Sequence, residues 1–417
     1  MNSSDTAPDA STASRAKTAG TLFIGGGALL LLTSACVVLA FMVIPFTQNA
    51  NALSVNTALL SVAAILIGYG ALLLAIGRGL RHDSLRAPFW LPSPWIFLGA
   101  LCAALVLGQL VLTLNVASAY LFPIWHVLAS LLFPLAVLAY ATQRLARVST
   151  RSVLAQFTWG GLVTIGLALV LELIIGGVLA LLALLGIAFV LGPGAVNEIA
   201  QALRTVPTDM ERVAEIIFEK PFSAVIAGSA AFLMIVILVP LLEELLKSTG
   251  AAFLMFRRVR AAFLPARGNA ILWGLAAGAG YAFSENMLNG QGTLNNPDSL
   301  TGIWAGAMIL RAGTSLMHMI ATATVCVGWY EALVAHKRAR LPLLLAAAVL
   351  AHAIWNTSAL LLAGVSMTRT ASVPLASVST ILTVLVLGLL GFLFAGGLFW
   401  LRALIRWAQR APVSSQT

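Results

Sequence analysis

Charged residues are scarce in this sequence. Only 9% of the 417 residues are Asp, Glu, Lys or Arg, whereas 60% are hydrophobic, and the mean hydropathy is +0.98. Soluble domains are about 45–50% apolar, so this composition excludes an ordinary soluble globular protein. We therefore expect an all-α fold, a polytopic membrane helical bundle with about ten transmembrane helices in a lipid bilayer.

Cysteine is also rare, and the three residues lie inside apolar runs: Cys36, Cys102 and Cys326. No CxxC pair is present, so the sequence predicts neither a disulfide framework nor a cysteine metal site. The net charge of +10 does not indicate nucleic-acid binding. Such binding needs a basic stripe, whereas the basic residues here form short clusters between apolar segments. We expect no nucleic-acid partner.

The common hydrolytic motifs are missing as well. The sequence contains no HExxH zinc motif and no GxSxG nucleophile. It also lacks a GxGD-like aspartyl pair, since Asp298 lies in a predicted loop. Serine and aspartyl mechanisms of intramembrane hydrolysis are therefore disfavoured.

Apolar runs long enough to cross the hydrocarbon of a bilayer recur along the chain, where about 20 residues suffice. The first five spans lie near residues 20–45, 55–77, 92–114, 120–141 and 157–192, the last read as one long or bent helix. Five more lie near residues 222–256, 268–289, 302–330, 341–366 and 375–401.

Lys and Arg are distributed unevenly over the loops between these spans. Of the 24 basic residues, 18 fall on one side of the membrane, in clusters such as Arg257 to Arg267 and Lys337 to Arg340. Cytoplasmic loops carry such an excess. We therefore expect an integral membrane protein with both termini in the cytoplasm.

The spans and the polar segments between them predict five regions. Residues 1–19 form a disordered cytoplasmic tail, and residues 20–192 form an N-terminal membrane region of five spans. Residues 193–221 are an outer polar segment, in which Thr208 and Glu211 have capping-box spacing ahead of an amphipathic helix or a plain loop helix. Residues 222–366 form a second membrane core, and residues 367–417 contain the last span and a cytoplasmic tail.

Ionisable and amide side chains gather within four spans of the second core. A charged side chain at bilayer depth costs a few kcal/mol on insertion scales, so each is a functional-site candidate. The spacings i, i+4 and i, i+7 place several on shared helical faces, and most lie near mid-bilayer. We expect four helices to present them to one cavity: Glu243, Glu244, Lys247, Glu285, Arg311, His318, His352 and Asn356.

These residues stand in motifs that resemble a known family. The segments EELLK (243–247), YAFSEN (281–286), an Arg seven residues before a His (311, 318) and HAIWN (352–356) occur in this order. The set resembles the PrsW family of intramembrane proteases and, more distantly, the superfamily of CAAX prenyl proteases and bacteriocin-processing proteins. Tyr281 replaces the usual Phe of the second motif, and Glu285 stands where the prenyl-protease relatives usually have His.

The resemblance implies a catalytic core over residues 222–366 that hydrolyses peptide bonds of membrane-anchored proteins, such as an anti-sigma factor in a bacterial inner membrane. By motif, Glu243 would be the general base and Glu244 an orienting or metal-assisting carboxylate. His352 and Asn356 would stabilise the oxyanion. Lys247 and Arg311 would offset part of the buried negative charge. Glu285 and His318 would position water or complete a metal site.

A glutamate-activated water without a metal cofactor is the preferred mechanism at this stage. The alternative is a zinc metallopeptidase, with ligands drawn from Glu243, Glu244, Glu285, His318 and His352. A proton-coupled transporter and a non-catalytic scaffold are alternatives of other classes, because buried ionisable residues also build proton relays. Glu172, alone in the fifth span, is interpreted as a helix-pairing or interfacial group.

Overall fold

The computed structural model describes residues 10–43, 52–82, 84–115, 117–145, 148–194, 197–199, 201, 221–289, 297–367 and 373–410. Its named elements are all helices. The first half comprises α1 (Ala10–Val43), α2 (Ala52–Arg81), α3 (Pro94–Leu114), α4 (Ser118–Thr142), α5 (Thr150–Thr158), η2 (Trp159–Thr164) and α6 (Ile165–Leu191). The second comprises α9 (Pro221–Phe232), η3 (Leu233–Leu238), α10 (Val239–Arg260), α11 (Arg267–Asn289), α12 (Pro297–Leu333), α13 (Arg340–Met367) and α14 (Val373–Gln409).

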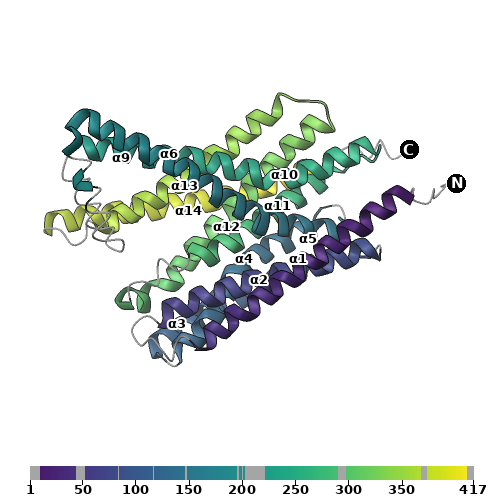
Figure 1. The fold of residues 1–417 in the computed structure, drawn as a ribbon, viewed down its shortest axis with the longest axis horizontal. Coiled ribbons are helices and arrows are strands. Elements are labelled where there is room, and N and C mark those ends of the chain that lie inside the picture. Colours follow the sequence, from purple (N-terminus) through teal and green to yellow (C-terminus); the bar gives the residue numbers. More distant parts are fainter. Residues whose placement is uncertain are drawn as a thin grey trace.

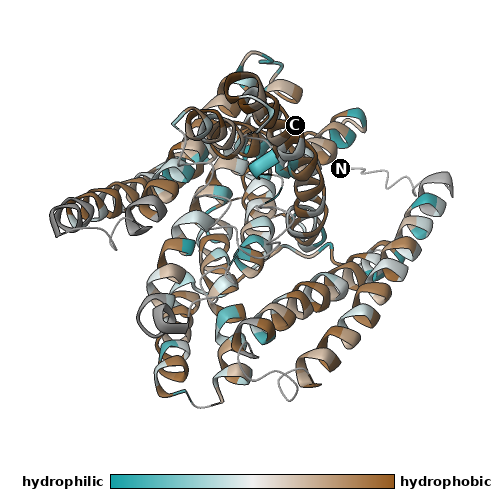
Figure 2. Ribbon diagram, turned by 60° about the vertical axis from the view of Figure 1, so that its left-hand side comes forward, coloured by the Kyte–Doolittle hydropathy of each residue, from teal (hydrophilic) through white to brown (hydrophobic). Residues whose placement is uncertain are grey.

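Each expected span corresponds to a helix or to a run of consecutive helices. Among the described residues, 8 helices are long and apolar enough to cross a membrane. The other two of the ten expected spans, near 268–289 and 302–330, form α11 and α12, which carry Glu285, Arg311 and His318. The protein is thus an all-helical, polytopic membrane protein, as the composition predicts. Figure 2 shows the long outer helices mainly in the brown of apolar residues, with hydrophilic positions inside the bundle and near helix ends.

The central helix is α11, which packs against α12, α10, α4, α5 and η2. Nearly all of its residues from Gly268 to Met287 are buried. Small residues allow this, because a Cβ at Gly278 would lie 2.6 Å from Met319 Cα of α12 and one at Gly280 would overlap the Phe157 carbonyl of α5. These glycines therefore bring the neighbouring backbones against α11.

Two membrane helices contain a π-helical segment. The expected span 157–192 is one continuous helix in which α5, η2 and α6 follow without a break. The second long helix runs through α9, η3 and α10, and its π-helical segment η3 ends two residues before Pro240. Proline cannot donate a backbone hydrogen bond, so the chain must adjust just ahead of it. Both irregular segments lie beside the polar centre described below.

The start of α1 and the connections α10–α11 and α12–α13 lie at the right-hand side in Figure 1. These segments carry basic clusters in the sequence, so the clusters lie at one side of the bundle. This arrangement agrees with the distribution that predicts cytoplasmic termini, and the orientation in the membrane stays a prediction. The amphipathic helix expected after Thr208 lies outside the described residues, and the five-region division also stays a prediction.

Candidate active site

Helix α10 places three charged side chains inside the bundle. Glu244 and Lys247 are fully buried and Glu243 is 6% exposed. Lys247 Nζ donates to Glu243 Oε2 at 3.1 Å and to Glu244 Oε1 at 2.6 Å, since residues three and four apart share a helical face. The first motif therefore forms a buried ionic cluster.

Helix α12 adds His318 to this cluster. Lys247 Nζ lies 2.9 Å from His318 Nδ1, and His318 Nε2 lies 2.6 Å from Glu285 Oε2 of α11. Since Glu285 only accepts when ionised, Nε2 carries the proton and Nδ1 directs its lone pair towards the cluster. Glu285 is held in turn by Arg311, whose guanidinium nitrogen lies 3.1 Å from Oε1. Glu285 and Arg311 thus orient His318.

Helix α13 supplies the second histidine. His352 Nδ1 lies 3.1 Å from Glu244 Oε1, and His352 Nε2 lies 3.9 Å from Glu243 Oε2. A proton on Nδ1, shared with the carboxylate, leaves Nε2 as the nitrogen with a free lone pair. The two imidazole rings are nearly perpendicular, with their centroids 4.8 Å apart and an interplanar angle of 87°. The Nδ1 lone pair of His318 therefore faces the Lys247 ammonium, and the Nε2 lone pair of His352 lies on the side of Glu243 without a hydrogen bond to it.

Two further side chains complete the wall of the site. Thr322, one helical turn after His318, donates to Glu244 Oε2 at 3.0 Å. The ring of Tyr281 lies 4.2 Å from Lys247 Nζ and 5.1 Å from the His318 ring. The aromatic replacement in the second motif thus contacts both the lysine and a histidine, as a Phe there also would.

Asn356 is the predicted site residue that the structure places apart from the cluster. Its Nδ2 donates to the Ile235 carbonyl in η3 at 3.1 Å. A π-helical segment leaves carbonyls outside the regular hydrogen-bond ladder, and the amide satisfies one of them. This contact ties α13 to η3, and it gives no support to the expected role of Asn356 as an oxyanion donor.

Four of these side chains together form a donor set suited to a metal ion. One ligand atom from each of Glu243, Glu244, His318 and His352 lies within 4.8 Å of all the others, and all four residues are buried. Two carboxylates and two imidazoles are ligands that zinc accepts. The Lys247 ammonium contacts three of the same residues, so a bound cation and this ammonium would use the same lone pairs. Glu285, predicted to position water or to complete a metal site, lies outside this donor set and contacts His318 Nε2 at 2.6 Å.

The sequence reasoning missed two residues near this centre. Thr322 could have been found, because it lies four residues after His318 and so shares its helical face. Glu172 is predicted to be a helix-pairing or interfacial group, yet its buried Oε1 has no hydrogen-bond partner among the described residues. A carboxylate in the middle of an apolar span was the available signal.

A family model agrees with this geometry. The model described as PrsW family intramembrane metalloprotease matches residues 148–390, more than half of the chain and more than the 222–366 core that the motifs indicated. The match includes all four helices of the site together with η2 and α6. No curated protein and no solved structure matches the chain. The metallo-type description favours the zinc alternative over the metal-free mechanism preferred from the sequence.

Proposed function

The chain belongs to the PrsW family of intramembrane metalloproteases, and from this premise we propose that Glu243, Glu244, His318 and His352 bind one catalytic zinc ion. The substrates would be membrane-anchored proteins, cut within or at the edge of the bilayer. The single observation that carries the proposal is the buried set of four donor atoms, within 4.8 Å of one another, supplied by three helices.

The donor chemistry supports zinc over the other divalent ions. Calcium and magnesium prefer sites made of oxygen ligands alone, whereas two imidazoles favour zinc or another transition metal. The charge supports a cation as well. Three carboxylates, Glu243, Glu244 and Glu285, face only two basic side chains, Lys247 and Arg311, so the cluster has excess negative charge when both histidines are neutral.

When bound, zinc supplies Lewis acidity at the scissile carbonyl and an activated water. The protein's own residues then have three tasks. Glu285 holds His318 in one tautomer, and Thr322 fixes one oxygen of Glu244, as polar partners of metal ligands usually do. Glu243, the least buried of the α10 carboxylates, would bind the ion through one oxygen, and its other oxygen would accept a proton from the attacking water.

Lys247 gives the same cluster a cation of its own. Its ammonium neutralises part of the carboxylate charge and is fully buried, so bulk water does not reach it. The arrangement permits a folded state without metal, in which Lys247 links the carboxylates of α10 to His318 of α12. The metal-free mechanism is therefore the second candidate, in which Glu243, beside the Lys247 ammonium, accepts a proton from the attacking water.

The test uses purified protein in liposomes and a single-span reporter with a fluorophore and a quencher on either side of its membrane segment. We expect Glu244→Gln and His352→Ala to abolish both reporter cleavage and zinc content, measured by mass spectrometry of the metal. Glu331→Gln is the matched control, because Glu331 is a buried glutamate of α12 that pairs with Arg340 at 2.9 Å, away from the site.

Substrate identity is the finer part of the proposal. Comparing the membrane proteomes of cells that contain the wild-type protein or Glu244→Gln would reveal single-span proteins that accumulate uncut in the variant. A wild-type cleavage pattern in Glu244→Gln, with zinc retained, would refute the assigned site. Proton-coupled uptake into the liposomes without any proteolysis would instead favour a transporter.

A further inference from the structure

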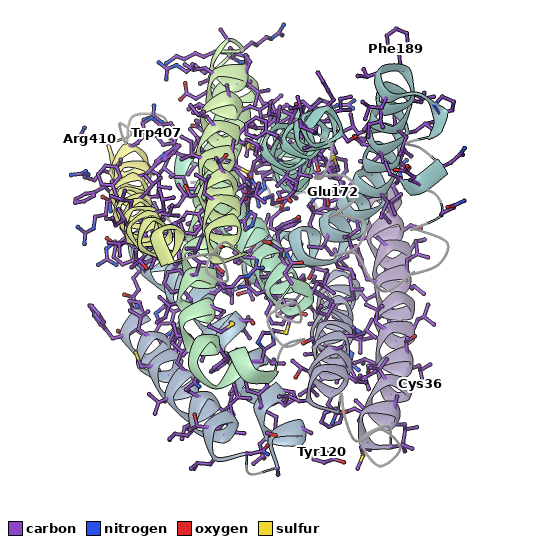
Figure 3. All side chains as sticks on the ribbon, turned by 90° about the vertical axis from the view of Figure 1, so that its left-hand side faces the viewer. Cys36, Tyr120, Glu172, Phe189, Trp407 and Arg410 are labelled. Carbon is purple, nitrogen blue, oxygen red and sulfur yellow. The ribbon has the colours of Figure 1, made fainter. Side chains whose placement is uncertain are left out.

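Glu172 lies in α6, near the middle of the continuous helix Thr150–Leu191, which otherwise suits a lipid environment. Its neighbours Leu173 and Ile174 are 76% and 58% exposed and apolar. A carboxylate among such residues is costly to insert and is usually retained for a function. Figure 3 labels Glu172 within the outline of the bundle, whereas Phe189, further along the same helix, stands at its edge.

Two contacts fix the register between α6 and the helix that carries the active site. Thr164, at the end of η2, donates to the Leu246 carbonyl at 3.4 Å. At the other end of the contact, a Cβ at Gly176 would lie 3.9 Å from the Met234 methyl group. From the first contact to the second, the residue number rises from 164 to 176 on one helix and falls from 246 to 234 on the other, so the two helices run antiparallel. Glu172 follows Thr164 by eight residues and Leu238 precedes Leu246 by eight residues, so Glu172 lies level with Leu238.

This register places Glu172 near the active site but outside the donor set. Leu238 precedes Glu243 by five residues, about 7 to 8 Å along a helix. The face that bears Glu172 is turned towards α10, because Ala168 and Thr164, four and eight residues earlier, are both fully buried. The charge of Glu172 interacts with those of Glu243, Glu285 and Lys247, which agrees with this placement.

One oxygen of this carboxylate has no partner in the protein. Glu172 Oε1 is buried and makes no hydrogen bond within the described part of the chain. Buried acceptors are normally satisfied, and an orphaned one points to a group that is absent from the structure. A structural role in pairing α6 with a neighbour would require a partner that the oxygen lacks.

We infer that Glu172 is a substrate-positioning residue, whose carboxylate accepts hydrogen bonds from the backbone N–H groups of a substrate segment that lies against α6 and η3. A membrane-spanning substrate is helical, so its N–H groups are bonded within the helix. Cleavage requires that a few residues unwind, and within the bilayer no water satisfies the released donors. Glu172 Oε1, one to two turns from Glu243, offers them an acceptor. This inference rests on the proposed function.

The reporter assay tests the inference with two variants and a control. Glu172→Leu removes the acceptor, and we expect its KM to rise about tenfold or more, because one charge-assisted hydrogen bond is lost, while kcat changes less. Glu172→Gln keeps a carbonyl acceptor and should stay closer to the wild type. Leu173→Ala, on the lipid-facing side, should leave both constants unchanged. Zinc content should be the same in all four proteins.

A second measurement does not depend on cleavage. Because Oε1 has no partner, Glu172→Leu should unfold at the same temperature as the wild type or a higher one. A Glu172→Leu protein that unfolds several degrees lower, or that cleaves the reporter with unchanged KM, would overturn the inference.

If the wild type cleaves no reporter, the proposed function fails separately, and binding decides the inference. The same reporter carrying a photo-crosslinking leucine would then be compared on wild type and Glu172→Leu. Loss of crosslinking in the variant supports the role of Glu172. Equal crosslinking refutes it.

Discussion

Replacing Lys247 with methionine removes the ammonium that contacts three of the four proposed ligands. Nζ lies 3.1 Å from Glu243 Oε2, 2.6 Å from Glu244 Oε1 and 2.9 Å from His318 Nδ1, and the side chain is fully buried. Removing one partner of a buried ion pair costs about 3–5 kcal/mol, because the remaining charge is left uncompensated. We expect the metal-free Lys247→Met protein to lose stability of that order.

The same substitution should strengthen zinc binding. An ion that enters the wild-type site must displace the ammonium from the carboxylates, whereas an ion that enters the variant displaces nothing. If zinc binding restores about 3 kcal/mol of the stability lost with the ion pairs of Lys247, the zinc affinity of the variant exceeds that of the wild type ~100-fold. Zinc should therefore stabilise the variant against heat more than it stabilises the wild type.

The assay is thermal unfolding in detergent, with chelator and then with buffered zinc, together with a competition titration against a zinc indicator. Lys337→Met is the matched control. Lys337 is 54% exposed and lies 3.9 Å from Glu331, so its loss should cost about 0–1 kcal/mol and leave zinc affinity unchanged. Zinc affinity that is equal to the wild type or weaker in Lys247→Met would refute the reasoning.

Two further substitutions separate the roles of the surrounding residues. Glu285→Gln weakens the hold on His318 Nε2, and we expect zinc affinity to fall about 10- to 100-fold in the same titration; an unchanged affinity would show that Glu285 does not orient the ligand. Asn356→Ala removes the hydrogen bond to the Ile235 carbonyl, which should cost about 1 kcal/mol of stability in thermal unfolding with zinc affinity retained. Loss of cleavage without loss of stability in Asn356→Ala would instead restore its predicted role as an oxyanion donor.

Most of the fold follows from the sequence because composition and span length dominate in a membrane. Apolar runs of about 20 residues predict the helices, and Gly278 and Gly280 predict close packing around α11. The gathering of Glu243, His318 and His352 is also predictable, because each lies in a motif at a similar depth within its span.

The rest depends on how helices distant in the sequence face one another. Helical spacing places His352 and Asn356 on one face, but it does not reveal that η3 offers a carbonyl to Asn356. The central position of Lys247 cannot be predicted from the sequence, because it depends on the rotamers of side chains on three helices. Glu172 could not be assigned to the site without the register between α6 and α10, since no motif surrounds it.

Reporter cleavage by the purified wild-type protein, measured after complete removal of metal and during stepwise return of zinc, tests the central claim most directly. The proposed site of Glu243, Glu244, His318 and His352 predicts that cleavage falls to background without metal and returns fully at one zinc ion per protein. Full cleavage by protein shown to contain no metal would contradict the claim and would support the glutamate-activated water expected from the sequence.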